Sequence, residues 1–377
     1  MDPQTSATLR FRRPVLQARG YVPQWRGLDR SKFLCLDLNE SNRPIPDTVL
    51  NALTKYLATN GVHTYPESGR LAEPLAFYCG VSPDCLLATN GSDQAIDLCL
   101  RTFLADGRRM LVARPEFSIF GHVADLAGAR IDGVPYHDNL DFPYAEFMRA
   151  AEAHKPDLIV IINPNNPTGT SVDADFIEEV ASRYPDIPVI VDEAYYEYTG
   201  RTVAGLIGSH RNIIVLRTFS KAFAMAGLRL GYVIADPLVV AQIAKLRGPF
   251  DVNELAVVAA EAQLAELDSM RRYVREVVHE SKPMVVDFFS RIGIPTWPGE
   301  ANFVLVRPLA CDEAVQFLRE HGILVRTMGA ALLTGMFRMS MGSPGQMARF
   351  IRVYEAYAAN GRDRADHAAG SELGGNP

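Results

Sequence analysis

The chain has 377 residues, which is enough for one large domain and a smaller one. Its 38 Lys and Arg are outnumbered by 44 Asp and Glu, giving a net charge of -6, so it has no basic excess with which to bind nucleic acid or an anionic lipid surface. With 48% hydrophobic and 22% charged residues, its composition is that of an ordinary globular protein that buries a core.

The cysteines and histidines argue against a disulfide scaffold and against a metal site. Five scattered cysteines form no CxxC pair, and eight histidines form no HExxH or HxxxH group, so we expect no metal and a reducing compartment. The N-terminus has no apolar stretch of the secretory type, and no apolar run reaches the roughly 18 residues that span a bilayer. We therefore expect a cytoplasmic protein that binds neither nucleic acid nor membrane.

Short apolar runs alternate with helical patterns from about residue 85 onward. Continuous apolar runs predict strands that are buried on both faces; they are Leu86–Thr89, Met110–Ala113, Leu158–Ile162, Val189–Val191, Ile213–Leu216 and Gly231–Ile234. Amphipathic stretches between them predict helices at Gln94–Leu104, Ile119–Leu126, Ala174–Arg183 and Leu238–Leu246. This alternation predicts an α/β domain with a mainly parallel sheet, whose ligand site lies beyond the carboxyl ends of the strands.

The pattern changes after Pro249. It predicts a long helix over about 253–292 with a kink at Pro283, followed by shorter elements, namely a strand at Asn302–Val306, a helix after Asp312, and strands near Ile323–Arg326 and Phe337–Met341. We interpret these as a smaller α+β domain at 251–357, joined by part of the N-terminal arm at 1–45, beside a large domain at 46–250. Residues 358–377 are rich in Gly, Ala and charge and predict a disordered tail.

The first strand-to-helix junction has the composition of a phosphate-binding turn. It reads Asn90-Gly91-Ser92-Asp93-Gln94, where Gly91 permits a tight turn and Ser92 or Asp93 can cap the helix that follows. Backbone N–H groups at such a helix start bind phosphate. An ordinary N-cap gives the same sequence, so the junction alone does not decide between the two.

Two later strand ends carry polar groups. Leu158–Ile162 leads into a turn fixed by two prolines and a glycine, in which Asn166 carries an amide that can donate to a ligand oxygen. Val189–Val191 ends in Asp192-Glu193-Ala194-Tyr195. An acid at the end of a buried strand needs a cation or a donor. A helix cap or an internal ion pair would satisfy Asp192, and so would a cationic ring nitrogen of a ligand that Tyr195 also reaches.

The next strand end carries a lysine and several phosphate donors. Lys221 lies in a weakly polar segment, where partial desolvation would lower its pKa and favour the free amine needed for a Schiff base; a lone lysine is otherwise most often a solvated surface charge. Thr218, Ser220 and Arg229 supply two hydroxyls and a guanidinium, which suit a phosphate monoester. A phosphate, a cationic ring nitrogen, a ring hydroxyl and an aldehyde together describe pyridoxal 5′-phosphate.

With these motifs in this order, the sequence resembles the fold-type-I pyridoxal-phosphate enzymes and, among them, the histidinol-phosphate aminotransferase branch of the class I/II aminotransferases. The resemblance runs from about Tyr21 to Gly342 and implies a mainly parallel seven-stranded sheet in the large domain. It implies that Lys221 forms the Schiff base and moves a proton at the substrate α-carbon, and that Asp192 pairs with the ring nitrogen. The remaining cofactor contacts that it implies are Asn166 and Tyr195 on the ring 3′-oxygen, Phe117 stacked on the ring, and Ser92, Asp93, Thr218, Ser220 and Arg229 on the phosphate.

The resemblance also implies the substrate contacts and a partner. Tyr65 matches the segment that reaches the cofactor phosphate of a second subunit, which implies a homodimer with shared active sites. Arg338 matches the arginine that binds the substrate carboxylate. Arg326 and Tyr21 match positions at the distal end of the substrate, which is a phosphate in this branch. For Phe117 and Arg338 the alternatives are a core aromatic and a surface strand arginine.

Some residues depart from the family pattern. The segment Asn39-Glu40-Ser41-Asn42-Arg43-Pro44 has no glycine where the backbone normally lies against the substrate. Phe250 replaces a tyrosine and cannot donate to a substrate phosphate, and Arg43 is expected to add a positive charge near the mouth of the site. These departures affect the substrate assignment and leave the cofactor assignment unchanged.

The resemblance implies an aminotransferase that moves an amino group between an amino acid or amino-alcohol phosphate and a 2-oxo acid such as 2-oxoglutarate. A decarboxylase of the threonine-phosphate type, or an enzyme that oxidises or cyclises an amino acid, is the alternative, because the bond that breaks depends on which one stands perpendicular to the ring. A nicotinamide dehydrogenase is disfavoured, since no GxGxxG follows the early strands. A non-catalytic cofactor-binding regulator is disfavoured as well.

Overall fold

A seven-stranded sheet forms the centre of the protein, whose computed structural model describes residues 9–18, 20, 27–59 and 61–359. The strand order is β2-β8-β7-β6-β5-β3-β4, and only β8 runs antiparallel to its neighbours. This confirms the predicted mainly parallel seven-stranded sheet. The strands are β2 (Leu86–Thr89), β3 (Arg109–Arg114), β4 (Arg130–Pro135), β5 (Leu158–Ile162), β6 (Val189–Asp192), β7 (Ile213–Thr218) and β8 (Gly231–Ala235).

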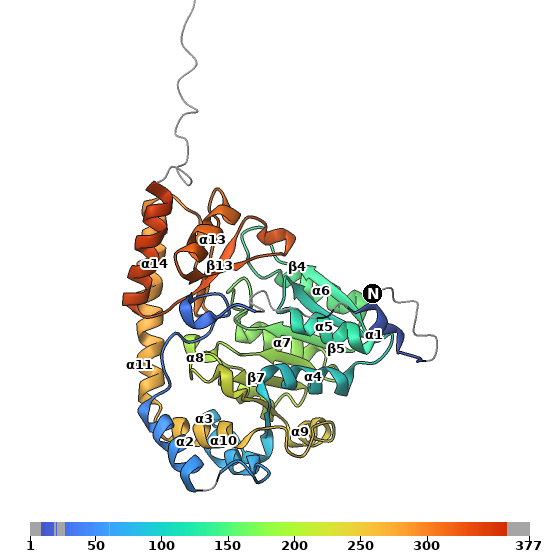
Figure 1. Ribbon diagram of the computed structural model, residues 1–377. Coiled ribbons are helices and arrows are strands. Elements are labelled where there is room, and N and C mark those ends of the chain that lie inside the picture. Colours follow the sequence, from blue (N-terminus) through green and yellow to red (C-terminus); the bar gives the residue numbers. More distant parts are fainter. Residues whose placement is uncertain (1–8, 19, 21–26, 60, 360–377) are drawn as a thin grey trace, which may run out of the picture.

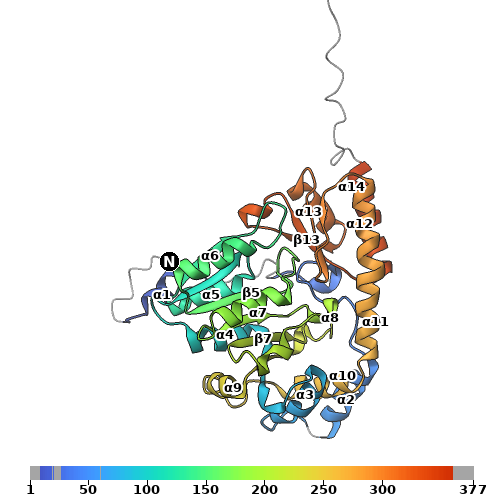
Figure 2. The same ribbon diagram turned by 180° about the vertical axis from the view of Figure 1, so that it is seen from behind.

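Helices cover both faces of this sheet (Figures 1 and 2). Because side chains alternate along a strand, neighbours such as Ile159 and Val160 in β5 enter different hydrophobic clusters. One face packs against α4 (Gly91–Phe103), α5 (Ser118–Ala127) and α9 (Pro237–Ala244). The other packs against α6 (Tyr144–His154) and α7 (Ala174–Arg183). Burial on both faces explains why the strands read as continuous apolar runs.

The long helix predicted over 253–292 is not one helix. The chain forms α10 (Glu254–Ala265), breaks at residues 266–267, and then continues through α11 (Asp268–Glu276), a π-helical turn η6 (Val277–Ser281) and α12 (Lys282–Arg291). The π turn directly precedes Pro283, which has no N–H to donate to the preceding turn. While α10 packs against α2 (Asp47–Thr59) and α3 (Ala72–Cys79), the α11–α12 rod leads away to the C-terminal part of the chain (Figure 1).

The C-terminal part forms a second, smaller sheet of four antiparallel strands. Its order is β12 (Arg326–Thr327), β13 (Phe337–Ser340), β10 (Phe303–Val306) and β9 (Thr296–Trp297). Helices α13 (Cys311–Glu320) and α14 (Pro344–Tyr357) pack beside it, with α14 also lying along α12. The N-terminal strand β1 (Leu34–Cys35) pairs in parallel with β11 (Ile323–Leu324) in a separate two-stranded sheet, so the segment that follows β1 starts from the C-terminal part of the molecule.

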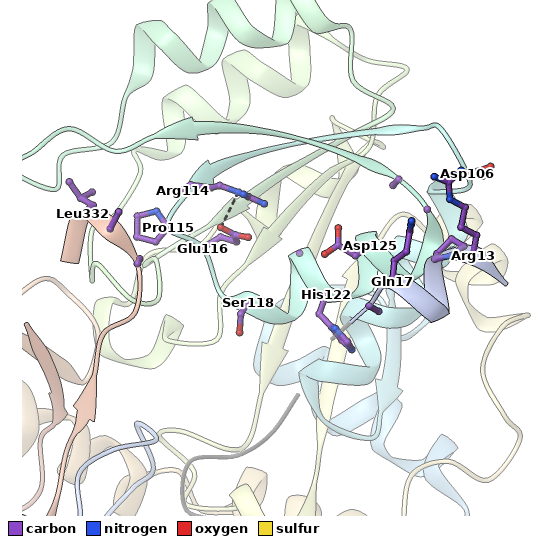
Figure 3. A pocket seen from close by; sticks show the side chains of 17 residues that line it. Arg13, Gln17, Asp106, Arg114, Pro115, Glu116, Ser118, His122, Asp125 and Leu332 are labelled. Atoms are coloured by element: carbon purple, nitrogen blue, oxygen red, sulfur yellow. Dashed lines mark ion pairs between the residues drawn. The ribbon is translucent and has the colours of Figure 1, made fainter. Parts of the chain in front are cut away.

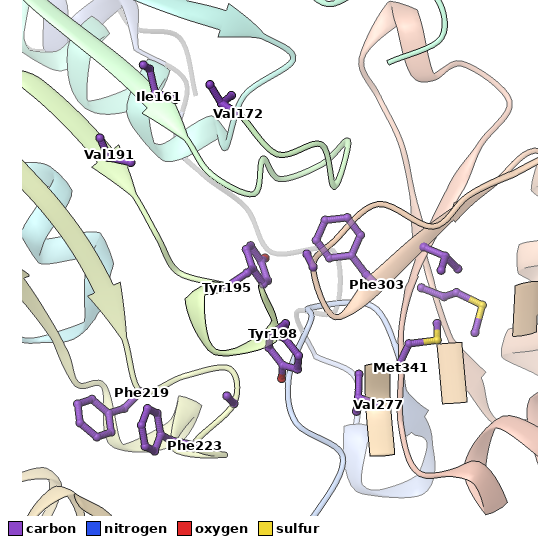
Figure 4. Packing of buried hydrophobic residues seen from close by; sticks show 14 of the residues in the cluster. Ile161, Val172, Val191, Tyr195, Tyr198, Phe219, Phe223, Val277, Phe303 and Met341 are labelled. Atoms are coloured by element: carbon purple, nitrogen blue, oxygen red, sulfur yellow. The ribbon is translucent and has the colours of Figure 1, made fainter. Parts of the chain in front are cut away.

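The largest hydrophobic cluster joins the two parts of the molecule. Tyr195, which follows β6, lies edge-on to Phe303 of β10 with ring centroids 5.5 Å apart. Tyr198 and Met341 continue the cluster toward η6 (Figure 4). The apolar contacts therefore reach the carboxyl edge of the large sheet, where the polar motifs predicted from the sequence converge. No helix in the described part of the chain has the length and hydrophobicity to cross a membrane.

Candidate active site

The start of α4 forms a cradle with the adjoining ends of three strands. Gly231 of β8 lies opposite both Thr89 of β2 and Thr218 of β7. A Cβ atom on Gly231 would lie 2.5 Å from the backbone nitrogen of Ser92, so only glycine lets the helix start approach this closely. The side chain of Asn90 does not cap the first turn of α4. The backbone N–H groups in the first turn of α4 are therefore suited to bind an anion at this end of the helix.

The other predicted phosphate donors lie around this cradle. Thr218 and Ser220 are buried, and the Ser220 N–H donates to Thr218 Oγ1 at 3.1 Å. Arg229 has a left-handed backbone with a φ of 55°, and its Nη2 donates to Asp93 Oδ2 at 3.1 Å. A Cβ atom on Gly91 would meet the Arg229 guanidinium at 2.7 Å. Hydroxyls, helix N–H groups and a guanidinium thus gather at one end of α4, as a phosphate requires.

Asp192, the last residue of β6, is an almost fully buried carboxylic acid. Its Oδ1 accepts a hydrogen bond from the Ala194 N–H at 3.0 Å, and it forms no ion pair with any lysine or arginine among residues 9–18, 20, 27–59 and 61–359. Burial raises its pKa to about 7, and the charges of Asp93 and Glu193 add to the rise. A buried carboxylate without a protein cation fits a ligand with a cationic ring nitrogen.

Lys221 lies just beyond the end of the neighbouring strand β7. Its Nζ donates to the carbonyl oxygen of Leu38 at 3.0 Å. Desolvation lowers the pKa of the amine to about 8, with the nearby Arg338 cation adding to the effect. The direction agrees with that expected from the weakly polar sequence, and it leaves part of the lysine as a free amine near neutral pH.

Tyr195 and Asn166 both present polar groups whose partners are set by the protein. The Tyr195 ring is buried, and burial raises its pKa to about 12, so the hydroxyl keeps its proton. Its oxygen accepts a hydrogen bond from Asn39 Nδ2 at 2.8 Å. The Asn166 Oδ1 accepts a hydrogen bond from Arg338 Nη1. With that oxygen occupied, the amide nitrogen of Asn166 is the end that remains to donate.

The two predicted substrate arginines lie side by side on the smaller sheet. Arg338 of β13 is 7% exposed and stands directly opposite Arg326 of β12. Its Nη2 donates to the carbonyl oxygen of Asp37 at 3.0 Å, and its guanidinium lies 5.2 Å from the centre of the Phe303 ring. Like charges opposite each other on a sheet destabilise it. An anionic ligand that meets both guanidinium groups would remove this cost.

Segment 37–39 also belongs to the site, although the sequence assigned no contact to Asp37 or Leu38 and placed only the backbone from Asn39 onward near the substrate. Three successive residues each contact a predicted site residue: the Asp37 carbonyl accepts from Arg338, the Leu38 carbonyl accepts from Lys221, and the Asn39 amide donates to Tyr195. The contacts use backbone atoms and a residue with a φ of 56°. The one signal in the sequence is the asparagine itself, which adopts left-handed conformations more readily than most residues.

Arg43, which was expected to add a positive charge near the mouth of the site, has several partners within the fold. Its guanidinium donates to the backbone and hydroxyl oxygens of Ser269 at 2.8 and 3.0 Å and to the Ala222 carbonyl at 3.4 Å, and it lies 4.8 Å from the Tyr273 ring centre. The residue joins the N-terminal segment to α11 and to the loop after Lys221. Its guanidinium therefore makes structural contacts beside the loop that carries Lys221.

Three other residues were expected to contact the cofactor or the substrate. Tyr21 falls outside the described residues. Tyr65 is 79% exposed and stacks on the half-exposed Phe250, with ring centroids 4.3 Å apart. Phe117, just before α5, is partly buried and packs against the cluster between the sheet and α4, α5 and α9, which also suits a core aromatic.

A groove of about 1150 Å³ lies beside the carboxyl end of β3 (Figure 3). It runs between α1 (Arg13–Gln17), α5 and residues 330–332, and includes Arg114 and Glu116. None of the predicted site residues lines it, although it begins beside Phe117. Among the described residues, no group of three or more His, Cys, Asp or Glu side chains is placed to hold a metal ion.

Comparisons with known proteins identify the family of the chain. Residues 32–353 match the family described as aminotransferase class I and II. A histidinol-phosphate aminotransferase of Symbiobacterium thermophilum is 35% identical over 363 residues, covering 93% of this chain and 99% of the relative. One from Carboxydothermus hydrogenoformans is 34% identical, covering 91% and 97%. The crystal structure of histidinol-phosphate aminotransferase from Sinorhizobium meliloti in complex with pyridoxal 5′-phosphate is 24% identical and has a TM-score of 0.81, covering 93% of this chain and 99% of that one.

Proposed function

Because this chain belongs to the aminotransferase class I and II family and is a pyridoxal-phosphate-dependent aminotransferase, we propose that it transfers the amino group of an amino-alcohol phosphate such as histidinol phosphate to 2-oxoglutarate. The observation that carries the proposed site is the pair formed by the buried Asp192, which has no ion-pair partner within hydrogen-bond distance among the described residues, and the desolvated Lys221 on neighbouring strand ends. The names of the relatives at 34–35% identity support the substrate.

The described residues fit the cofactor at each of its polar groups. The α4 start with Ser92 and Asp93, together with Thr218, Ser220 and Arg229, would hold the phosphate. Asp192 would hold the ring nitrogen as a cation, while Asn166 and Tyr195 would donate to the ring oxygen, and Phe117 would cover one face of the ring. When bound, pyridoxal phosphate withdraws electrons from the substrate carbon that bears the amine, which makes its proton acidic.

The chain itself supplies the acid–base and binding steps. Lys221 would first hold the cofactor aldehyde until the incoming amine releases it. Its free amine would then take the proton from the substrate α-carbon and deliver it to the cofactor carbon C4′. A pKa of about 8 suits both directions of this transfer near neutral pH. Arg326 and Arg338 would bind the two carboxylates of the 2-oxo acid, and they would also bind the phosphate of the amino donor. Tyr21 would contact the distal end of the bound substrate.

We also propose a homodimer in the cytoplasm with shared active sites, in which Tyr65 reaches the cofactor phosphate of the partner subunit. Support comes from the 79% exposure of Tyr65 and from further apolar side chains exposed on α2 and α3. A reducing compartment accords with the five cysteines, all of which are free thiols.

A half-reaction screen tests the proposed function. Holoenzyme is mixed with histidinol phosphate, phosphothreonine, glutamate or unphosphorylated histidinol, and the loss of visible cofactor absorbance reports amino transfer. We expect rapid loss with histidinol phosphate and glutamate, a slow reaction with histidinol, and little with phosphothreonine. Release of CO₂ from phosphothreonine, with the visible band retained at the end, would instead assign a decarboxylase.

A second lysine provides the matched control for the attachment site. Lys282 is buried, and burial also lowers its pKa to about 8, but its amine donates to the Gly299 and Ala301 carbonyls away from the strand ends. Borohydride reduction of the holoenzyme followed by peptide mapping should mark Lys221 and leave Lys282 unmodified. Label on Lys282 alone would contradict the proposed site.

A further inference from the structure

Asn39 holds the hydroxyl of Tyr195 from a position outside the predicted constellation. Its side chain is 1% exposed, and its Nδ2 donates to Tyr195 Oη at 2.8 Å across 156 residues of sequence. Its backbone has a φ of 56°, and its carbonyl oxygen accepts from Asn302 Nδ2 at 3.2 Å. The hydrogen bond from Asn302 therefore holds the main chain of Asn39 in place beside Tyr195.

The chemistry of the two groups settles which one donates. An amide nitrogen can only donate, whereas a phenol oxygen can accept one hydrogen bond while donating its own proton to another group. When the Tyr195 oxygen accepts from Asn39, the hydroxyl proton must point away from Asn39. Tyr195 follows β6 by three residues and interacts electrostatically with Asp192 and Arg338, so its hydroxyl lies near the strand end where the cofactor is proposed to bind.

Because cofactor binding belongs to the function proposed above, the contact acquires a role in that site. We propose that Asn39 is a positioning residue for Tyr195: it occupies the phenol oxygen as an acceptor and so directs the hydroxyl proton toward the ring oxygen of bound pyridoxal phosphate. Arg338 sets the polarity of Asn166 in the same way by occupying its Oδ1. Both donors to the ring oxygen are thus oriented by protein groups that do not touch the ring oxygen themselves.

Such orientation changes the acidity of the lysine-linked cofactor. With Lys221 holding the bound cofactor, the ring oxygen that Tyr195 would contact would attract the proton at the point of attachment. A donated hydrogen bond stabilises negative charge on that oxygen and weakens its hold on that proton. Without the orientation by Asn39, the Tyr195 hydroxyl would donate less often to the ring oxygen. The proton at the lysine–cofactor linkage would then be lost only at a higher pH.

The left-handed backbone of Asn39 allows two informative substitutions. Aspartate and glycine both tolerate a φ near 56°. Asn39→Asp keeps the size of the side chain and replaces the donor with an acceptor, which pulls the hydroxyl proton of Tyr195 away from the ring. Asn39→Gly removes the donor without adding a charge. Melting curves of both cofactor-free variants report whether the fold is retained.

A pH titration of visible absorbance in the holoenzyme tests the proposal. We expect the titration midpoint to rise by about one pH unit in Asn39→Asp, as for loss of a hydrogen bond to a charged group, and to rise by less in Asn39→Gly. In a Tyr195→Phe background, Asn39→Asp should cause no further rise. Tyr198→Phe is the matched control, because it also removes a buried tyrosine hydroxyl close in sequence to Tyr195. The Tyr198 hydroxyl has no hydrogen-bond partner within the described residues.

Two results would overturn the role of Asn39: an unchanged midpoint in Asn39→Asp, or an equal rise with and without the Tyr195 hydroxyl. The first is expected if the amide oxygen, and not the nitrogen, faces Tyr195, because aspartate would then preserve the contact. A wild-type protein that binds no pyridoxal phosphate and shows no visible band would overturn the proposed function as well. A normal visible band with an unshifted midpoint overturns only the role of Asn39.

Discussion

At the scale of single residues, the site is built from groups that weaken the cofactor-free protein. Asp192 is nearly buried without a cation, and burial raises its pKa to about 7 from an ordinary value of 3.8. Lys221 shows the reverse effect, since desolvation lowers the pKa of its amine to about 8 from 10.5. Both shifts mean that folding disfavours the charged form. A ligand that supplies the missing counter-charges would recover this free energy.

Asp192→Asn should therefore stabilise the cofactor-free protein at alkaline pH. Between pH 3.8 and about 7 the unfolded wild-type chain has released the Asp192 proton while the folded chain still holds it, so stability falls as the pH rises, by about 4 kcal/mol in all. The asparagine variant lacks this loss. Its melting temperature should equal that of the wild type near pH 4 and exceed it by several degrees at pH 8.

The same substitution should weaken cofactor binding, because an amide does not hold a cationic ring nitrogen. Fluorescence titration of both cofactor-free proteins with pyridoxal phosphate at pH 8 measures this loss, which we expect to be at least tenfold. A variant that is neither more heat-stable at pH 8 nor weaker in binding would show that Asp192 has a partner in the protein and no role toward the ring.

At the scale of elements, the sequence predicts those features that depend on local pattern. Strand β5 begins and ends where the apolar run Leu158–Ile162 predicts, because a strand with both faces buried requires such a run. Strand β4 was not predicted. It is an edge strand paired only with β3, and its sequence, Arg130–Pro135, has exposed and half-exposed positions that break the apolar pattern.

In the site, too, contacts that follow from local sequence pattern were predictable and contacts that depend on the tertiary fold were not. Asp192 and Lys221 were predictable neighbours, because parallel strands place their carboxyl ends on one edge of the sheet. The contact of Asn39 with Tyr195 was not predictable, since it depends on where the segment that follows β1 crosses that edge. The position of Arg43 was equally hidden, because its partners on α11 are more than 200 residues away in sequence.

The α4 cradle leads to a prediction about Gly231. In Gly231→Ala the added Cβ would meet the Ser92 nitrogen at 2.5 Å and the Gly91 carbonyl carbon at 2.6 Å, which are backbone atoms that cannot move without displacing the start of α4. We expect the affinity for pyridoxal phosphate to fall at least tenfold. Fluorescence titration of the cofactor-free protein measures it.

Gly227→Ala is the control for this substitution. Gly227 lies four residues away, its φ is not in the left-handed range, and a Cβ there meets nothing within 4 Å. Its affinity for the cofactor should match that of the wild type. If both variants bind pyridoxal phosphate normally, the phosphate does not rest on the start of α4.

At the scale of the whole molecule, exposed apolar side chains gather at one end. Helix α10 packs against both α2 and α3, which places the outer surfaces of these two helices in one region of the molecule (Figure 1). The side chains exposed there and on the adjoining loops are Leu50, Leu57, Val62, Tyr65, Phe77 and Phe250, with Phe77 92% exposed. A cluster of this kind is typical of a subunit interface.

Phe77→Asp should convert the proposed dimer into a monomer, because a charge at the centre of an apolar interface must be desolvated without a partner. Sedimentation velocity should give twice the chain mass for the wild type and the chain mass for the variant. Leu309→Asp, at a residue that is 65% exposed before α13, should stay dimeric. Since Tyr65 of the partner subunit is proposed to reach the cofactor phosphate, the Phe77→Asp monomer should also lose pyridoxal phosphate on gel filtration. A wild-type monomer with full activity would exclude shared sites.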